Sequence, residues 1–297
     1  MKNKDKIIIQ IVTLSIICVF LLVYMTYVIV GNRRLNYNLN MISNSTIVNN
    51  KVYDESFYSD IQSININTKY ADVIVNSVDD NLIHVTIYGK EDNYNRKGNT
   101  KEININTYNN CNLFCIDNNK YRIEVYIPEY YDKDIIINNN NGTIDVDEFK
   151  YANMYINNEI GNVTVFDVNN ITLNVRYGDI LLNNANNLEI KTTNSNIRIK
   201  EVNTCKIIND LGNIKIDKIN EYINIKNKTG NINIKDIILT TKSYINNGYG
   251  NINIERTSNV EVQAKTELGK NIINNKKEDN QVLLNINNKC GDIEVEN

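Results

Sequence analysis

The chain alternates apolar and polar residues in short runs, and these runs surround a turn that recurs through most of the sequence. From residue 135 onward the turn returns after 19, 17, 17, 17, 18, 20, 19 and 22 residues. The turn position is held by Gly142, Gly161, Gly178, Ser195, Gly212, Gly230, Gly250, Gly269 and Gly291. A repeat of this length around a turn predicts an all-β fold, a parallel β-helix or β-solenoid of about nine rungs.

Each repeat has one apolar pair before the turn and a second pair after it. In the repeat of Gly161 these pairs are Met154/Ile156 and Val163/Val165. Because side chains alternate across a strand, each pair lies on one face, and stacked repeats then enclose a continuous core.

Two repeats depart from this apolar pattern. Cys205 stands where other repeats have Ile, Leu or Met, so we expect it to be a small buried hydrophobe. After Gly269 the only inward apolar residue that we assign is Ile272.

The alternation begins earlier, at Ser63, in a run with Ala71 in the turn position, which predicts an early rung. Residues 76–130 then break the period. Polar segments separate three alternating runs in this stretch, at residues 83–87, 103–105 and 123–127. We expect a β-meander that caps the N-terminal end of the solenoid, since an open end leaves backbone groups unpaired.

The amino-terminal residues 7–30 carry no charge. A helix of this length, at ~1.5 Å per residue, reaches roughly 36 Å and can cross a ~30 Å hydrocarbon layer. Three lysines and the amino terminus precede it, which favours an N-terminus inside. A cleaved signal peptide is the alternative; the stretch is longer than a usual signal core and no small-residue cleavage site follows.

These segments give the expected domain organisation and location. The chain is divided into a cytoplasmic tail (1–6), a transmembrane signal anchor (7–30), a stalk (31–59) and an extracytoplasmic β-solenoid (60–297). The expected location is the cell membrane, with a single pass and the C-terminal domain outside.

Two polar positions recur with the turn. In most repeats Asn stands three residues before the turn position, with Val175 and Thr192 as exceptions, and Asn or Asp usually follows the turn residue directly. The residues expected to shape the turns are Gly142, Gly161, Gly178, Gly212, Gly230, Gly250 and Gly291, with Asn158, Asn209, Asn227, Asn247 and Asn288. Both residue types suit tight turns, and stacked amides can form a ladder. Calcium binding is the alternative for these oxygens, although most of the slots hold neutral Asn.

The candidate metal and catalytic residues are few. Cys111 and Cys115 are close enough to pair or to begin a metal site, but no second Cys or His pair completes one. His84 is the single histidine. We therefore expect no metal and no cofactor. A formal net charge of −3 also argues against nucleic acid as a partner.

Polysaccharide-active β-helix enzymes use clustered carboxylates on an outward face. The outward position after the turn reads Asp145, Thr164, Leu181, Arg198, Lys215, Asn233, Asn253 and Glu294. Neighbouring rungs build no carboxylate pair there, so we expect a non-enzyme without catalytic residues. Outward aromatic residues such as Tyr177 and Tyr249 are candidates for stacking on sugars, or for packing at the corners.

The last repeat ends at residues 295–297 with no visible cap. Either the insertion at residues 276–281 folds over this end, or two molecules meet there in an end-to-end homo-oligomer.

The chain resembles a known family at this level of detail. The motif Val125-Tyr126-Ile127-Pro128, the return through Ile135 and Ile137, and the serial Gly-Asn/Asp-Ile-x-Ile rungs resemble the bacterial putative-adhesin domain family. The resemblance covers residues 60–297 and implies a β-helical domain of unknown function, commonly anchored to the membrane with the domain outside. It implies no catalytic residues.

Three functions follow as hypotheses. The first is a non-catalytic envelope protein for adhesion, scaffolding or binding of cell-wall polymer or envelope proteins. The second is a sensor or accessory component of an envelope stress response, which the resemblance suggests because several members lie in such operons. The third is a polysaccharide-active enzyme.

Overall fold

The computed structural model describes residues 50–89, 94–99, 102–107, 120–274 and 281–296. These residues contain strands and turns, and no helix among them is long and apolar enough to cross a membrane. The expected anchor at 7–30, Cys111, Cys115 and the insertion from residue 276 through residue 280 lie outside the described residues.

The N-terminal strands are β1 (Lys51–Tyr58), β2 (Ser63–Thr68), β3 (Ala71–Val78), β4 (Leu82–Tyr88), β5 (Tyr94–Asn99), β6 (Glu102–Thr107), β7 (Tyr121–Pro128), β8 (Asp134–Asn141) and β9 (Ile144–Val146). The central strands are β10 (Phe149–Ile160), β11 (Val163–Tyr177), β12 (Ile180–Asn194), β13 (Ile197–Leu211) and β14 (Ile214–Thr229). The C-terminal strands are β15 (Ile232–Ile238), β16 (Ser243–Tyr249), β17 (Ile252–Ile254), β18 (Thr257–Ser258), β19 (Val260–Leu268), β20 (Asn271–Ile273), β21 (Val282–Cys290) and β22 (Ile293–Val295).

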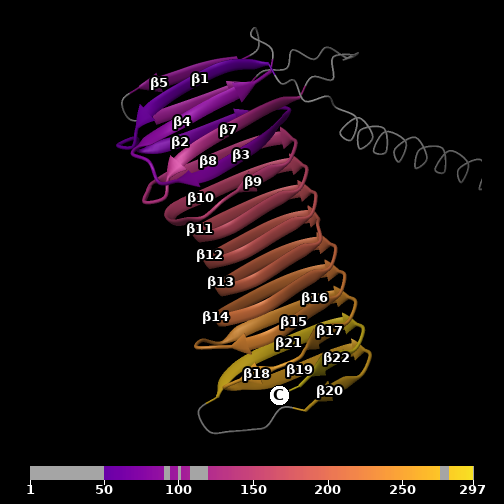
Figure 1. The fold of residues 1–297 in the computed structure, drawn as a ribbon. Helices are drawn as coiled ribbons and strands as arrows, with labels where there is room; N and C mark the ends of the chain where they lie inside the picture. The colour runs from indigo at the N-terminus through magenta and orange to yellow at the C-terminus, as the bar shows by residue number, and fades with distance from the viewer. Residues whose placement is uncertain (1–49, 90–93, 100–101, 108–119, 275–280, 297) are drawn as a thin grey trace, which may run out of the picture. The chain divides into compact units, whose positions relative to one another are not determined.

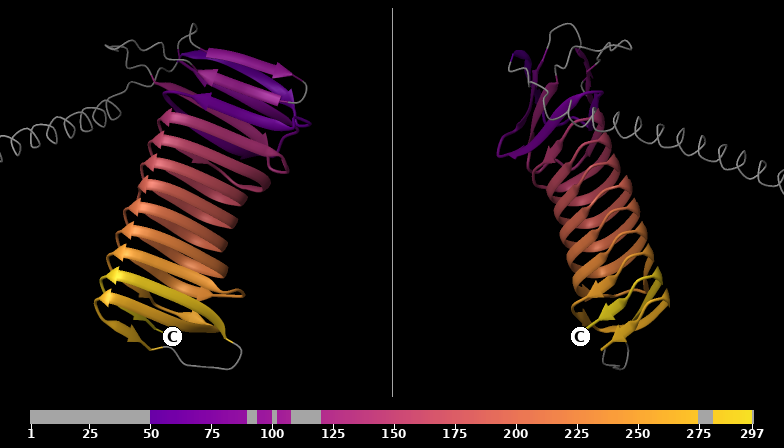
Figure 2. Two further views of the ribbon diagram at one scale, coloured as in Figure 1. Left: turned by 180° about the vertical axis from the view of Figure 1, so that it is seen from behind. Right: turned by 90° about the vertical axis from the view of Figure 1, so that its right-hand side faces the viewer.

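The strands form a parallel β-solenoid of about eight turns, against about nine expected. Each of β11, β12 and β13 pairs in parallel and in register with the strand that follows it. Successive coils stack along the chain (Figures 1 and 2). In the middle of the chain one strand runs from each turn to the next. We call the part of a strand that leads into a turn glycine the pre-turn strand, and the part that follows a turn glycine the post-turn strand.

The core is the stack of inward apolar residues that the repeat predicts. The pairs of the Gly161 repeat, Met154/Ile156 and Val163/Val165, are all buried, as is Cys205. Burial raises the pKa of the Cys205 thiol, as expected for a small hydrophobe that stays neutral.

The assignment of Ile272 to the core is wrong. Inward residues elsewhere stand two and four positions after the turn glycine, and after Gly269 these positions are Asn271 and Ile273. Ile272 is 43% exposed, whereas Ile273 packs partly against the core.

Residues 76–130 do not form a separate meander. Strands β6 and β7 make a coil of the solenoid, parallel to β2 and β3. Because β2 and β3 also pair with β8 and β9, the first coil in the sequence lies between two later ones. The strands outside the parallel coils differ from those expected in the cap: β4 is antiparallel to β7, and β5 is antiparallel to β6.

Part of the expected stalk is also a strand. Residues 51–58 form β1, antiparallel to β4. Val52, Tyr53 and Phe57 pack partly against the core, which gives this segment a place in the fold that its composition did not reveal.

The C-terminal end repeats the insertion seen at the N-terminal end. Strand β21 pairs with β16 on one side and with β19 on the other, and β22 lies between β17 and β20. The last repeat in the sequence is therefore an internal coil, so the expectation of an uncapped end at residue 295 is wrong. The terminal coil is β19–β20, and association of two molecules at that edge stays a prediction.

Candidate functional site: a groove on the post-turn face

The turn glycines adopt a backbone that other residues rarely take. Their φ angles lie between 127° and 157°. A Cβ added to Gly161 would come within 2.0 Å of the carbonyl oxygen of Gly142, so the coils stack too closely for a side chain. Ser195 occupies the slot without a positive φ, and its hydroxyl bonds Thr192.

The asparagines three residues before the turn face the interior. The side-chain amide of Asn158 donates to the carbonyl oxygens of Gly142 at 3.1 Å and Gly161 at 2.9 Å. The same bonding to turn carbonyls is made by Asn209, Asn227, Asn247 and Asn288. These side chains are buried, so they hold the turns together rather than face a ligand.

The residues after the turn glycine form a second ladder. The side-chain oxygen of Asn162 accepts the backbone N–H of Asp179 at 2.9 Å, and Asn213 accepts that of Asn231 at 2.8 Å. Backbone donors thus already use the oxygens proposed as calcium ligands. Among the residues that the structure describes, no cluster of three or more His, Cys, Asp or Glu could hold a metal ion.

A third ladder runs outside the core, on the pre-turn strands. Asn138 donates to Asn67 at 2.8 Å, Asn157 to Asn138 at 2.7 Å, and Asn174 to Asn157 at 2.8 Å. The sequence analysis missed it, although Asn138, Asn157 and Asn174 stand at one repeat position and directly precede the inward slot.

Many charged side chains of the solenoid pair with an opposite charge on the neighbouring coil. Such pairs are Arg176–Glu159, Lys206–Glu189, Lys218–Glu201, Lys228–Asp210 and Arg256–Asp236. They lie outside the outward post-turn position and neutralise much of the surface locally.

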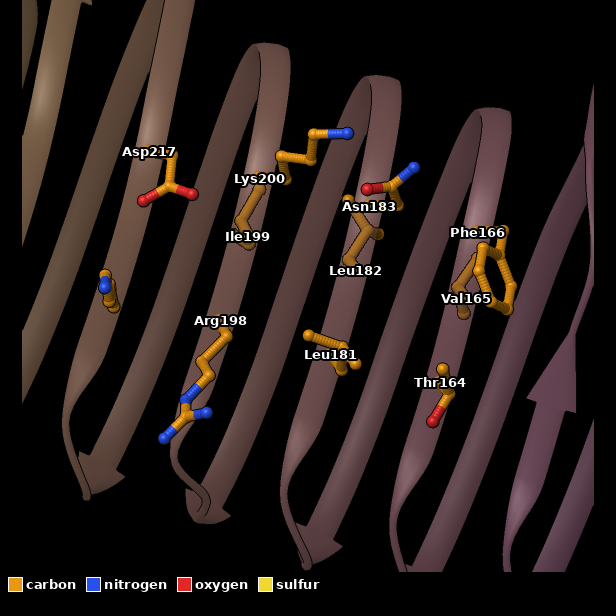
Figure 3. A pocket seen from close by; sticks show the side chains of 11 residues that line it. Thr164, Val165, Phe166, Leu181, Leu182, Asn183, Arg198, Ile199, Lys200 and Asp217 are labelled. Carbon is orange, nitrogen blue, oxygen red and sulfur yellow. The ribbon is translucent and has the colours of Figure 1, made fainter.

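A groove of about 410 Å³ lies on the outward side of the post-turn strands in β11 to β14 (Figure 3). Its outward lining is formed by Thr164, Phe166, Leu181, Asn183, Arg198, Lys200, Lys215 and Asp217. The volume falls within the range of small-ligand sites. We call it the post-turn groove.

The groove gathers three cations against one carboxylate. Arg198 and Lys215 are register neighbours on adjacent coils. In the described part of the chain, neither these two nor Lys200 has a carboxylate oxygen within the 4.0 Å of an ion pair. Lys200 extends toward Asn183 and away from Asp217 (Figure 3). Like charges directly opposite each other destabilise a sheet.

The other half of the groove carries two exposed apolar side chains beside Thr164 and Asn183. Phe166 is 50% exposed and Leu181 is 51% exposed, on the two coils that precede Arg198. The site therefore places two exposed apolar side chains beside three cationic ones.

The remaining surface candidates do not come together. Tyr249 is 61% exposed, whereas Tyr177 is half-buried and its ring faces the Arg176 guanidinium at 5.2 Å. Tyr177 and Tyr249 lie on non-adjacent coils, because Asn194, Leu211 and Thr229 follow Tyr177 in the same column before Tyr249.

Asp145 is a carboxyl at the outward post-turn position, and its surroundings raise its pKa. Desolvation by neighbouring atoms raises its pKa and Asp72 adds repulsion, while the Thr164 hydroxyl bond opposes both. Asp72 itself pairs with the buried ammonium of Lys120 at 2.5 Å and accepts the Thr143 N–H at 2.8 Å. These bonds make Asp72 a structural residue rather than the second carboxylate of an acid–base pair.

The comparison with solved structures finds low-identity matches. A putative cell adhesion protein from Clostridium sporogenes is 9% identical (TM-score 0.23), and the match covers 82% of this chain and 98% of that one. A putative adhesin from Parabacteroides distasonis is 16% identical (TM-score 0.34), and the match covers 84% of this chain and 100% of that one. A putative lipid binding protein from the same organism is 13% identical (TM-score 0.32), and the match covers 84% of this chain and 98% of that one.

No curated protein matches the chain. The sequence profile of one family, Toastrack DUF4097, matches residues 61–297, which is the greater part of the chain and includes every coil described above. The repeat, the parallel solenoid and this match together show that the chain belongs to the Toastrack DUF4097 family.

Proposed function

We propose that the chain is a non-catalytic binding protein of the cell envelope. Residues 7–30 would anchor it in the membrane and the solenoid would lie outside, presenting its lateral surface to envelope components. The observation that supports this most directly is the post-turn groove, where cations that have no ion-pair partner among the described residues adjoin exposed apolar side chains.

Two features support binding rather than catalysis. The polar residues that recur with the turn are used in backbone hydrogen bonds, so they are not available as acid, base or nucleophile. The groove is lined by cations, apolar groups and one carboxylate, a set that can hold an anion but lacks a paired acid and base.

The location is tested with the full chain carrying a C-terminal epitope tag in a bacterial host. We expect the tag to sediment with membranes, to resist extraction at high pH, and to be digested by protease added to cells without an outer barrier. A chain that lacks residues 1–30 is the control and should leave the membrane fraction. Protection of the tag in intact cells would contradict the proposed location.

Binding is tested separately, with the purified full chain in a neutral detergent and isolated envelope fragments. We expect co-sedimentation that saturates and that salt weakens, because the groove charges are exposed. Release of sugars or peptides from the fragments by the chain would instead support the enzyme hypothesis.

A further inference from the structure

The arrangement of charge in the post-turn groove restricts what can bind there. Arg198 and Lys215 stand on adjacent coils, ~4.8 Å apart along the solenoid axis. Lys200 is two residues after Arg198 and extends from the same side of the strand. The Arg198 guanidinium and the Lys200 ammonium point in opposite directions along the strand (Figure 3), so the three cations are spread across the groove, where separate acid groups of one ligand can contact them.

Phe166 and Leu181 extend the groove along the solenoid axis from these cations. Leu181 pairs in register with Arg198, and Thr164 pairs with Leu181, so the groove crosses four coils without interruption. A ligand that uses the whole groove must therefore offer acid groups to the cations and carbon-rich faces to Phe166 and Leu181. The groove runs along the solenoid axis, so it suits a ligand that is itself a chain.

We propose that the post-turn groove binds a linear anionic carbohydrate polymer. Its acid groups would contact Arg198, Lys200 and Lys215, and its sugar rings would lie against Phe166 and Leu181. This inference rests on the proposed function, because it names the ligand class of the same site.

A carbohydrate chain fits the groove better than a lipid bilayer does. The exposed apolar lining consists of two side chains, too few to bury in a membrane surface, and the carboxylate of Asp217 lies among the cations. A flat bilayer also cannot follow a groove that a flexible strand can enter. Nucleic acid is disfavoured by the net charge of −3 and by the small number of cations in the groove.

The test measures binding of the full chain, in neutral detergent, to a fluorescent galacturonic acid oligomer that is longer than the four coils of the groove, which repeat every ~4.8 Å. The fully methyl-esterified oligomer has the same rings without the charges. We expect the acidic oligomer to bind and the esterified one to bind at least tenfold more weakly. Equal binding of the two would overturn the proposal.

Variants then locate the binding. Arg198→Gln/Lys215→Gln should weaken binding roughly tenfold, since two charge-assisted contacts are lost. Asp217→Asn should strengthen it, because a competing carboxylate is removed. Phe166→Ser should weaken it without changing its salt dependence. The matched control is Lys206→Gln/Lys218→Gln, which removes the same charge from the same coils outside the groove and should leave binding unchanged.

The alternatives have separate outcomes. Stronger binding to a soluble short-chain anionic lipid, or to a thymidine oligonucleotide, than to the acidic oligomer would overturn the carbohydrate assignment. An equal effect of the groove variant and its control would show non-specific charge attraction and would overturn the site. Binding to envelope fragments without binding to the oligomer would refute this inference alone and leave the proposed function standing.

Discussion

At the scale of single residues, neighbouring asparagines have different roles that depend only on the face they occupy. Asn157 points outward and joins a ladder of exposed amides, whereas Asn158 is 2% exposed and holds two turn carbonyls. The sequence shows that Asn recurs in register, and alternation shows which Asn is inward. It does not show that the inward amide donates across coils, because that partner is set by the stacking distance.

This difference predicts unequal costs at adjacent positions. Asn158→Ala should lower the free energy of unfolding by about 2 kcal/mol, because the carbonyl oxygens of Gly142 and Gly161 lose a buried donor. Asn157→Ala, its control, should cost less than about 0.5 kcal/mol. Urea denaturation of the two variants measures both, and equal costs would contradict the assignment of Asn158 to the turn.

Replacement of Asn158 by Asp adds a pH test of the same contact. A buried carboxylate cannot donate to a carbonyl, so its pKa should rise in the folded protein. The folded state then binds more protons than the unfolded state, and Asn158→Asp should become less stable as the pH rises from 4 to 8.

At the scale of strands and coils, ion pairs between neighbouring coils replace the surface ladder where charges occur. Lys218 donates to Glu201 at 2.8 Å and Asn220 donates to the same carboxylate at 2.9 Å. Both bonds hold the pKa of Glu201 below its ordinary value. The stabilisation from such a group is present above the unfolded pKa and is lost as the pH falls through the folded pKa.

We therefore expect Glu201→Gln to be less stable than the native chain by about 0.5 kcal/mol at pH 7, a small value because the pair is 40% exposed on each side. The difference should begin to shrink as the pH falls below the ordinary glutamate pKa of ~4.3, and it should vanish only below the lowered pKa of the folded carboxylate. Urea midpoints of both proteins between pH 3 and 7 give the comparison. A difference that stays constant with pH would exclude the ion pair as its cause.

The same scale shows what could be predicted of the site. The outward column containing Leu181, Arg198 and Lys215 is readable from the repeat, and the strand pairing confirms that these residues are neighbours on successive coils. The sequence did not show that this column lines a groove. That required knowing that Glu189, Glu201 and Asp210 bond other cations and leave these cations without an ion-pair partner in the described residues.

At the scale of the whole solenoid, the repeat predicts the coil but not the order in which coils stack. Regular spacing in the middle of the chain makes sequence neighbours spatial neighbours, as β11 to β14 show. At both ends one coil enters between two others, and no feature of the alternation marks this. The chain skips a coil between β7 and β8 and again between β17 and β19, through the short segments 129–133 and 255–259, and neither segment carries a repeat that would mark the skip.

The inserted C-terminal coil gives the last prediction. Deletion of residues 259–280 removes β19–β20 and places Gly291 19 residues after Gly250, a spacing already present between Gly142 and Gly161. Because β16 and β17 already pair with β21 and β22, the shortened chain needs no new register. We expect it to fold, with Val282, Leu284 and Ile286 at the new end.

Truncation after residue 274 is the matched comparison, since it removes a similar length but takes away the internal coil. Strands β19 and β20 lose their partners β21 and β22. The truncation also exposes Ile245, Ile252 and Ile254, which are buried in the native chain. In a solenoid each coil contributes its own stability and that of its two interfaces, so this loss should be the larger by several kcal/mol. Thermal unfolding followed by far-UV circular dichroism distinguishes the two: if the truncated chain were as stable as the internal deletion, β21–β22 would not be an internal coil.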